Sequence, residues 1–198
     1  LTKNSKDYQN YITPKISFRF NPNDMKNYSS LSNKINVDNI FSNNRIGVND
    51  TLESGQSLTV GVDYKKEKIE NINKYFEMKL ATVFRDEEEN KMPKSSTLNK
   101  KNSNLYGSIS NRFSEFLALD YNFSLDNDYK TFDSNEIIAK LNVNNFATEF
   151  NFIKENGKTG DTNILENQTT FSIDENNFIK FNTRRNRKIN LTEYYNLV

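Results

Sequence analysis

The stretch "LALDYNFSLDND" at residues 117–128 alternates apolar side chains with small or polar ones almost without a break. Successive side chains of a β-strand point to opposite faces, so the pattern predicts a strand with one apolar and one polar face. In a soluble protein the apolar face covers a core, whereas in a membrane barrel it faces lipid and the polar face lines the interior. The apolar row consists of Leu117, Leu119, Tyr121, Phe123 and Leu125.

The composition of the 198 residues excludes several classes of protein. Hydrophobic residues make up 34% of the chain and the mean hydropathy is −0.85, which is too polar for helical membrane spans of roughly 20 apolar residues. The 13% share of aromatic residues argues against a disordered polar chain. Because the net charge is only +1, we expect no nucleic-acid partner.

The missing residue types limit the chemistry. The chain has no cysteine and no histidine, which excludes disulfides, cysteine zinc sites and histidine-dependent catalysis within it. We expect no catalytic residue, no metal site and no cofactor. The chain opens at Leu1 without a signal-peptide pattern and stops inside a strand-like run, so we interpret residues 1–198 as one partial barrel domain cut at both ends.

The same alternation recurs along the chain and predicts about ten strands, each near the roughly 9–11 residues that cross a bilayer at a tilt. Long connections, such as residues 21–56 and 87–103, alternate with short ones, such as residues 114–116 and 144–145. Outer-membrane barrels show this rhythm because their periplasmic turns are short and their external loops are longer. We expect the two long connections to fold over the external mouth.

The fold class that fits is all-β: an antiparallel, up-and-down transmembrane β-barrel segment belonging to a larger barrel. Charged mid-strand residues such as Asp63, Lys79 and Asp120 would face the lumen. On a soluble sheet they would face water, and the apolar rows would need a second sheet or helices to cover them. No amphipathic helix is visible, so lipid is the simpler cover, although a sandwich of two five-stranded sheets stays open.

Three short motifs carry candidate chemistry. The acidic run "DEEE" at residues 86–89 lacks the spacing of a calcium loop, and "GKTG" at residues 157–160 lacks that of a phosphate loop; we interpret them as a solvated loop and a turn. The basic run "NTRRNRK" at residues 182–188 is an exposed hairpin loop in one interpretation. In the other, Arg184, Arg185 and Arg187 bind lipopolysaccharide phosphates, since guanidinium pairs bidentately with phosphate.

Three stretches resemble the lipopolysaccharide-assembly protein LptD (OstA) family. Residues 39–64 resemble its segment in which a Phe-Ser-x-Asn-Arg core precedes an Asp and a Gly-x-Ser strand. Residues 83–110 resemble the next hairpin, and residues 183–198 resemble late strands ending in Leu-Thr-Glu-Tyr-Tyr, whereas agreement over residues 117–175 is weak. The positions that carry the resemblance are Phe41, Ser42, Asn44, Arg45, Asp50, Gly55, Ser57, Phe84, Arg85, Ser103, Gly107, Thr192, Glu193, Tyr194 and Tyr195.

The resemblance implies part of the outer-membrane translocon that inserts lipopolysaccharide into the outer leaflet of a Gram-negative bacterium, and not an enzyme. The implied partners are lipopolysaccharide, outer-membrane lipid, an LptE-like lipoprotein in the lumen, and a periplasmic Lpt bridge that would dock on a jellyroll domain missing from this chain. The motif positions are expected to be architectural, with Arg45 anchoring a long loop to lumenal acids. Two other functions stay open: a passive outer-membrane porin or channel, and a soluble secreted β-rich binding module.

Overall fold

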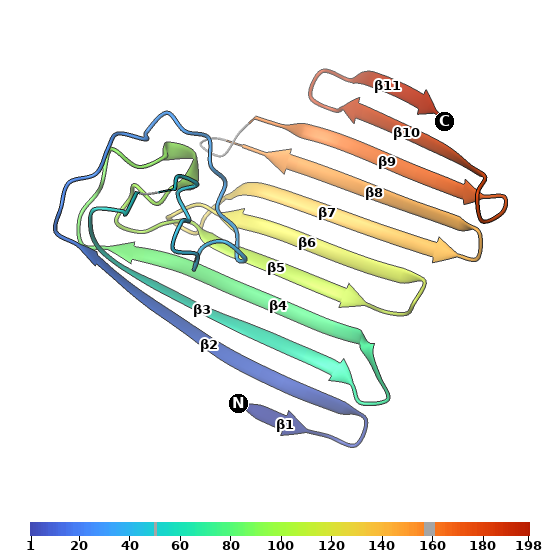
Figure 1. The fold of residues 1–198 in the computed structure, drawn as a ribbon, viewed down its shortest axis with the longest axis horizontal. Coiled ribbons are helices and arrows are strands. Elements are labelled where there is room, and N and C mark those ends of the chain that lie inside the picture. The colour runs from blue at the N-terminus through green and yellow to red at the C-terminus, as the bar shows by residue number, and fades with distance from the viewer. Residues whose placement is uncertain (50, 157–160) are drawn as a thin grey trace.

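The computed structural model describes residues 1–49, 51–156 and 161–198 and contains one antiparallel sheet of eleven strands. Each strand pairs with the next along the chain, so the order in the sheet runs from β1 to β11 (Figure 1). Among the described residues, no helix is long and apolar enough to cross a membrane. The elements are β1 (Thr2–Asn4), β2 (Tyr8–Asn21), β3 (Gly55–Lys68), β4 (Asn71–Arg85), η1 (Lys94–Ser96), β5 (Leu105–Arg112), β6 (Leu117–Leu125), β7 (Phe132–Val143), β8 (Phe146–Glu155), β9 (Asn163–Ser172), β10 (Phe178–Asn186) and β11 (Leu191–Leu197).

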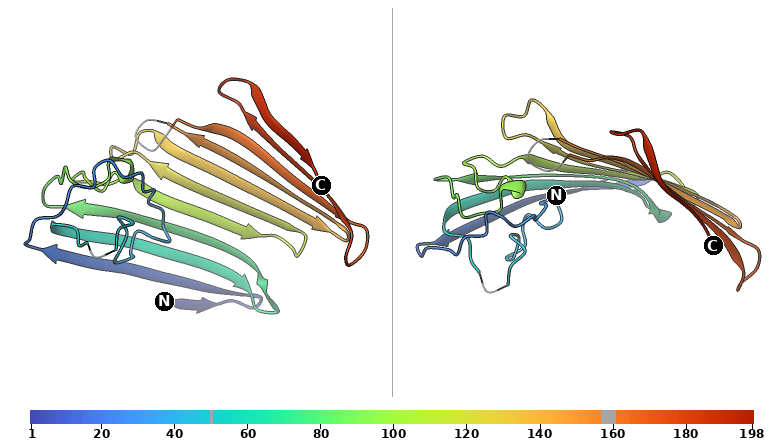
Figure 2. Two further views of the ribbon diagram at one scale, coloured as in Figure 1. Left: turned by 45° about the horizontal axis from the view of Figure 1, so that its top comes forward. Right: turned by 90° about the horizontal axis from the view of Figure 1, so that it is seen from above.

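The structure confirms the all-β, up-and-down architecture that the alternation predicts. The strand missed by the pattern is β1, whose three exposed residues pair with β2 through Thr2–Tyr11 and Asn4–Gln9. Three residues are too few to show a period of two, so no hydrophobic pattern could mark this strand. In the described part of the chain β1 and β11 do not pair with each other, and the sheet is an open, curved wall (Figure 2).

The predicted alternation of long and short connections is present up to β10, whereas the last connection, residues 187–190, is no longer than the one before it, residues 173–177. The connections after β2, β4, β6, β8 and β10 leave one end of the sheet, and the remaining ones leave the other end (Figure 1). Two of the latter are only two residues long, and the one that joins β7 to β8 contains Asn144, which has φ +50° as expected of a tight turn. The "GKTG" turn expected at residues 157–160 lies outside the described residues.

Strand register places the apolar side chains in continuous rows on one face, which we call the outer face. The opposite inner face carries a neighbouring polar row that includes Asp63, Lys79 and Glu136. Because the side-chain period is two, a slip of one residue would exchange the two rows, so the pairing is strongly specified. One outer row runs across eight strands through Ile12, Tyr64, Met78, Ile109, Tyr121, Ile137, Phe152 and Leu165.

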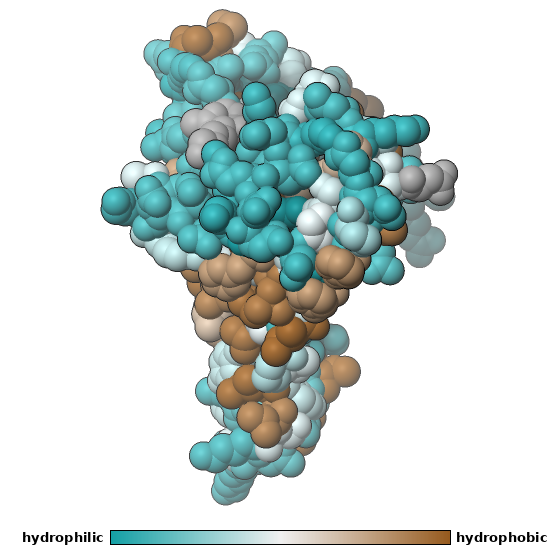
Figure 3. Space-filling view, turned by 90° about the vertical axis from the view of Figure 1, so that its left-hand side faces the viewer, coloured by the Kyte–Doolittle hydropathy of each residue, from teal (hydrophilic) through white to brown (hydrophobic). Residues whose placement is uncertain are grey.

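Large hydrophobic side chains remain uncovered on the outer face. Phe18 and Phe20 of β2 are 65% and 61% exposed, and Figure 3 shows hydrophobic surface directly beside the hydrophilic loops, with hydrophilic surface again beyond it. A soluble monomer rarely exposes such a continuous apolar surface. The outer face is therefore built to contact another apolar phase.

The buried core lies on the inner face and not between two sheets. The connections after β2 and β4 pack together over one face of β3–β5 at the long-connection end (Figure 2); we call residues 22–49, 51–54 and 86–104 the loop cluster. This cover explains why the inner face carries apolar residues such as Val83, which is 1% exposed. The core contains Ile40, Ile46, Met92 and Leu98 from the loop cluster and Ala81, Val83 and Tyr106 from the wall.

Arginine on the outer face should destabilise the protein in a bilayer, whereas arginine on the inner face should not. Phe150 of β8 lies on the outer face and Gln168 of β9 on the inner face, and both are exposed. We expect Phe150→Arg to lower the free energy of unfolding by about 2–4 kcal/mol and Gln168→Arg by less than about 0.5 kcal/mol. Urea unfolding of the full-length protein in vesicles measures both values, and equal losses would contradict the membrane orientation.

Gly107 should be required by the ring of Phe123, its partner across β5 and β6. A Cβ atom on Gly107 would lie 2.2 Å from Phe123 Cζ, and that ring is held between Tyr121 and Phe132, with centroids 5.3 and 5.9 Å away. We expect Gly107→Ala to cost about 1–3 kcal/mol of stability. In the Phe123→Ala background the same substitution should cost much less, and a double-mutant cycle without coupling would refute this contact.

Candidate functional site

Arg45 fastens the loop cluster to the wall. Its buried guanidinium pairs bidentately with Glu53, with Nε 2.5 Å from Oε1 and Nη2 2.6 Å from Oε2. The same group donates to Thr59 Oγ1 at 2.8 Å and to Ser57 Oγ at 3.1 Å, two hydroxyls on the inner face of β3. Such a fork fixes direction as well as distance, so it sets how the β2–β3 connection sits on β3.

Glu53 also joins Arg45 to Arg85, another motif position. Arg85 lies at the end of β4, where its Nη1 is 3.3 Å from Glu53 Oε2 and its Nη2 donates to the carbonyl of Ser54. We expected acids of the lumen as partners for Arg45, but its carboxylate comes from the same connection, because β3 presents hydroxyls at this point. Neither spacing nor composition distinguished Glu53 from the other acidic residues, so the sequence prediction missed it.

The first motif, around Phe41, rests on β2 and β3. Arg19 of β2 donates to the carbonyls of Phe41 and Ser42 at 3.1 and 2.9 Å. The Phe41 ring lies against Gly61, where a Cβ atom would be 2.9 Å from Phe41 Cζ. The ring therefore packs in space that a side chain at position 61 would occupy. Asn44 binds Asn49 within the connection at 2.7 Å, and Asp50 lies outside the described residues.

The other early motif positions have separate structural roles. Gly55 opens β3 with φ +75°, a conformation that L side chains rarely adopt. Phe84 lies on the outer face and is 40% exposed. Ser103 accepts a hydrogen bond from the backbone N–H of Val83 at 2.9 Å, which ties the second long connection to β4. The early motifs are therefore brought together around the loop cluster, apart from the outward-facing Phe84 and Gly107.

A cavity of about 260 Å³ with both polar and apolar lining residues remains between residues 34–38 and β5–β8. Lys34 reaches across it to an ion pair with Glu155 at the end of β8. Inside, Asn122 donates to Glu136 at 2.9 Å. The cavity therefore offers amide and carboxylate groups, which can hydrogen-bond a ligand, beside apolar side chains such as Ile35 and Ile153.

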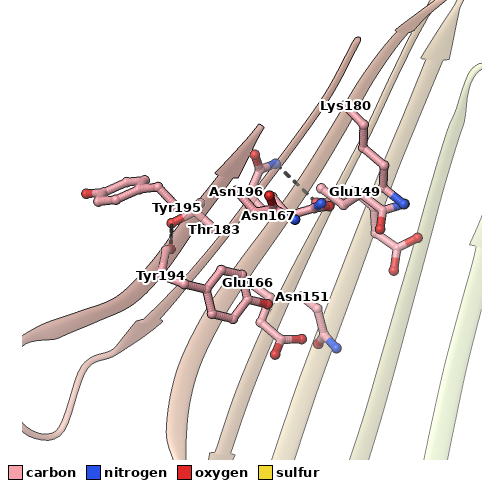
Figure 4. Close-up of a pocket in the computed structure, with 11 residues that line it drawn as sticks. Glu149, Asn151, Glu166, Asn167, Lys180, Thr183, Tyr194, Tyr195 and Asn196 are labelled. Atoms are coloured by element: carbon pink, nitrogen blue, oxygen red, sulfur yellow. Dashed lines mark hydrogen bonds between the residues drawn. The ribbon is translucent and has the colours of Figure 1, made fainter. Parts of the chain in front are cut away.

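A second polar surface lies on β8–β11, beyond the loop cluster. A shallow pocket of about 660 Å³ is lined by side chains that include Asn151, Glu166, Lys180 and Tyr194 (Figure 4). Tyr194 and Tyr195 point to opposite sides of β11 (Figure 4). The described residues contain no group of three or more potential metal ligands. This surface can hydrogen-bond a polar partner.

The Thr192–Glu193–Tyr194–Tyr195 motif contains a β-bulge. Arg184 pairs with Tyr194 but Arg185 pairs with Thr192, so Glu193 is the extra residue. The bulge allows Glu193 Oε2 to approach Arg184 Nε to 2.9 Å. Tyr195 instead lies near Phe181, with ring centroids 6.3 Å apart.

The three arginines predicted to bind phosphate do not lie together. Arg184 faces inward and is paired with both Glu166 and Glu193. Arg185 occupies the outer row after Leu165 and donates to Asn190 at 2.5 Å, and Arg187 lies over the Phe152 ring, 5.2 Å from its centroid. Adjacent residues of a strand face opposite ways, so only Arg185 and Arg187 share the outer face.

Removing the carboxylate of Glu53 should loosen the whole loop cluster. Glu53→Gln removes the carboxylate that bridges two buried guanidinium groups, so we expect the free energy of unfolding to fall by about 3–5 kcal/mol. The matched control is Asp24→Asn. It breaks the exposed ion pair between Asp24 and Lys91, which joins the same two connections and in which the hydrogen bond from Lys91 lowers the pKa of the Asp24 carboxyl group. The control should leave protease resistance of the loops unchanged, and equal sensitivity of both variants would argue against a central role for Glu53.

Comparison with known proteins agrees with this architecture. A family model described as LptD, LPS transport system D, matches residues 1–184. No curated protein matches the chain significantly. The matched region includes the loop cluster and its arginine network, and it ends at Arg184. The chain therefore belongs to the LptD family, a family of outer-membrane lipopolysaccharide transport proteins of Gram-negative bacteria that is not known for enzymatic activity.

Proposed function

We propose that this chain forms part of the wall and the loop lining of the outer-membrane translocon that inserts lipopolysaccharide into the outer leaflet. The observation that carries the proposal is the two-faced wall of an LptD-family chain: apolar rows outside, polar rows and packed loops inside. Lipid covers the outer face in this proposal. Residues 1–198 then act as one partial barrel domain, because the unpaired backbone groups of β1 and β11 need further strands within the bilayer.

In this proposal the inner face is covered partly by the chain's own loops and partly by a partner protein. The loop cluster covers β3–β5, whereas the polar pocket of β8–β11 lies outside that cover. An LptE-like lumenal lipoprotein would contact this uncovered surface of β8–β11, and the periplasmic Lpt bridge would deliver lipopolysaccharide from the short-connection end. The amide and carboxylate groups of the cavity beneath residues 34–38 would hydrogen-bond the sugar part of the passing lipid.

The outer face offers an arginine pair at the level where lipopolysaccharide phosphates would lie. Arg185 and Arg187 are at the long-connection end, with Phe152 and Leu165 beside them on the same face. Guanidinium groups bind phosphate bidentately, while the neighbouring apolar row suits acyl chains. Arg184 is left out of this contact because two carboxylates already occupy it.

The two alternative functions have less support. A soluble binding module would need its apolar rows covered, yet Phe18, Phe20 and Ile16 are 61–75% exposed. A passive porin would share the two-faced wall, but it gives no account of the family match over residues 1–184.

The function is tested by depleting the full-length protein in its own bacterium and measuring lipopolysaccharide at the cell surface. We expect surface lipopolysaccharide to fall and to return when the wild-type protein is resupplied. Unchanged surface lipopolysaccharide together with a lost permeability to small solutes would instead identify a porin.

The arginine pair is tested by photocrosslinking lipopolysaccharide to the outer face beside Phe152. In Arg185→Gln/Arg187→Gln we expect the crosslinked fraction to fall on the order of tenfold, as expected for two charge-assisted contacts. Arg184→Gln should retain it, with equal membrane levels of all variants as the control. A larger loss in Arg184→Gln would place the phosphate contact on the inner face.

A further inference from the structure

A lysine cluster lies on the outer face at the short-connection end, opposite to the arginine pair. It consists of Lys66 and Lys68 from β3 and Lys74 from β4, which surround a cavity of about 250 Å³. Tyr8, Phe76 and Phe113 also line this cavity. Three lysine side chains thus line one small space together with aromatic side chains.

Most lysines of the inner face have a carboxylate partner, with Lys180 of β10 as the exception among the described strands. Four inward lysines have carboxylates within 4 Å: Lys15 with Asp63, Lys65 with Glu67, Lys79 with Glu77, and Lys140 with Glu149.

In the lysine cluster only Lys68 has such a partner, Glu70, at 3.2 Å, and that side chain is 81% exposed. Within residues 1–49, 51–156 and 161–198, neither Lys66 nor Lys74 has a carboxylate at that distance, and the Lys66 ammonium instead lies 4.3 Å from the centroid of the Tyr8 ring. The cluster therefore has an excess of positive charge that the described chain does not balance.

The cluster stands at the border of the apolar surface. Lys66 follows Tyr64 of the long outer row by two residues on the same strand, which is about 7 Å along β3. Phe76, the partner of Lys66 across β4, continues the apolar surface toward the cavity. A ligand with a phosphate in the cavity and hydrocarbon along the row would match both parts of this surface.

We propose that the lysine cluster binds the phosphate of an anionic phospholipid, phosphatidylglycerol in the test below, in the leaflet at the short-connection end. The inference rests on the proposed function for the placement of the outer face in lipid. Lys66 and Lys74 hold the phosphate, Tyr8 positions Lys66, and the acyl chains lie along Ile12, Tyr64 and Met78. Lysine suits this role because its flexible stem reaches a headgroup from the apolar border.

The test measures spin-labelled lipids bound to the full-length protein in phosphatidylcholine vesicles. We expect labelled phosphatidylglycerol to be immobilised in preference to labelled phosphatidylcholine. In Lys66→Gln/Lys74→Gln that preference should fall on the order of fivefold or more, and raising the salt concentration should weaken the wild-type preference. The matched control is Lys154→Gln, an exposed lysine on the outer face at the opposite end, which should keep the preference.

The outcomes separate the two proposals. If neither lipid is immobilised, the outer face does not contact lipid and the proposed function fails with the inference. If both lipids are immobilised equally, or if Lys154→Gln loses as much preference as the double variant, the outer face does contact lipid but the phospholipid site is refuted. Circular dichroism and heat-modifiability of each variant show whether it is folded, and Lys66→Arg/Lys74→Arg should keep the preference.

Discussion

The buried ion pair between Arg45 and Glu53 determines how the rest of the inner face is organised. A charge pair removed from water is tolerated only when its remaining hydrogen-bonding capacity is satisfied, and here Ser57, Thr59 and the carbonyl of Ile40 complete the arginine's contacts. The pair therefore requires β3 and the β2–β3 connection to be in one arrangement. Once that connection is fixed, the second one packs on it, and the inner face of β3–β5 becomes the floor of a small apolar core.

The strands were predictable because their side-chain period is two and one row of the outer face is apolar from Ile12 to Leu165. The alternation in residues 117–128 identified a face that register then extends across eight strands. The loop cluster was not predictable in the same way. Val83 and Tyr106 are apolar residues on the nominally polar face, and only the position of the connections above them, set by contacts distant in sequence, explains their burial.

The candidate site shows the same limit. Arg45 and Arg85 were marked by the family resemblance, but their shared partner Glu53 was not, because pairing depends on where the chain returns. Arg184, Arg185 and Arg187 were predicted to act together because they are close in sequence. Adjacent residues of a strand face opposite ways, however, and this alone places Arg184 and Arg185 on different faces. The two outer-face clusters, arginine at one end and lysine at the other, bracket the apolar rows and would fix the height of the wall in a bilayer.

The bulge at Glu193 has a consequence for how this hairpin tolerates changes in length. The ladder on either side of it is regular, with Arg185 opposite Thr192 and Arg184 opposite Tyr194, so the strand holds one residue more than pairing needs. Loss of that residue would restore an unbroken ladder and leave Tyr194 and Tyr195 on their present faces. Loss of a residue elsewhere in the ladder, with the bulge retained, would turn the paired side chains beyond it over, exchanging interior for exterior. A deletion at this one position can therefore shorten the hairpin without changing the face on which the following side chains lie.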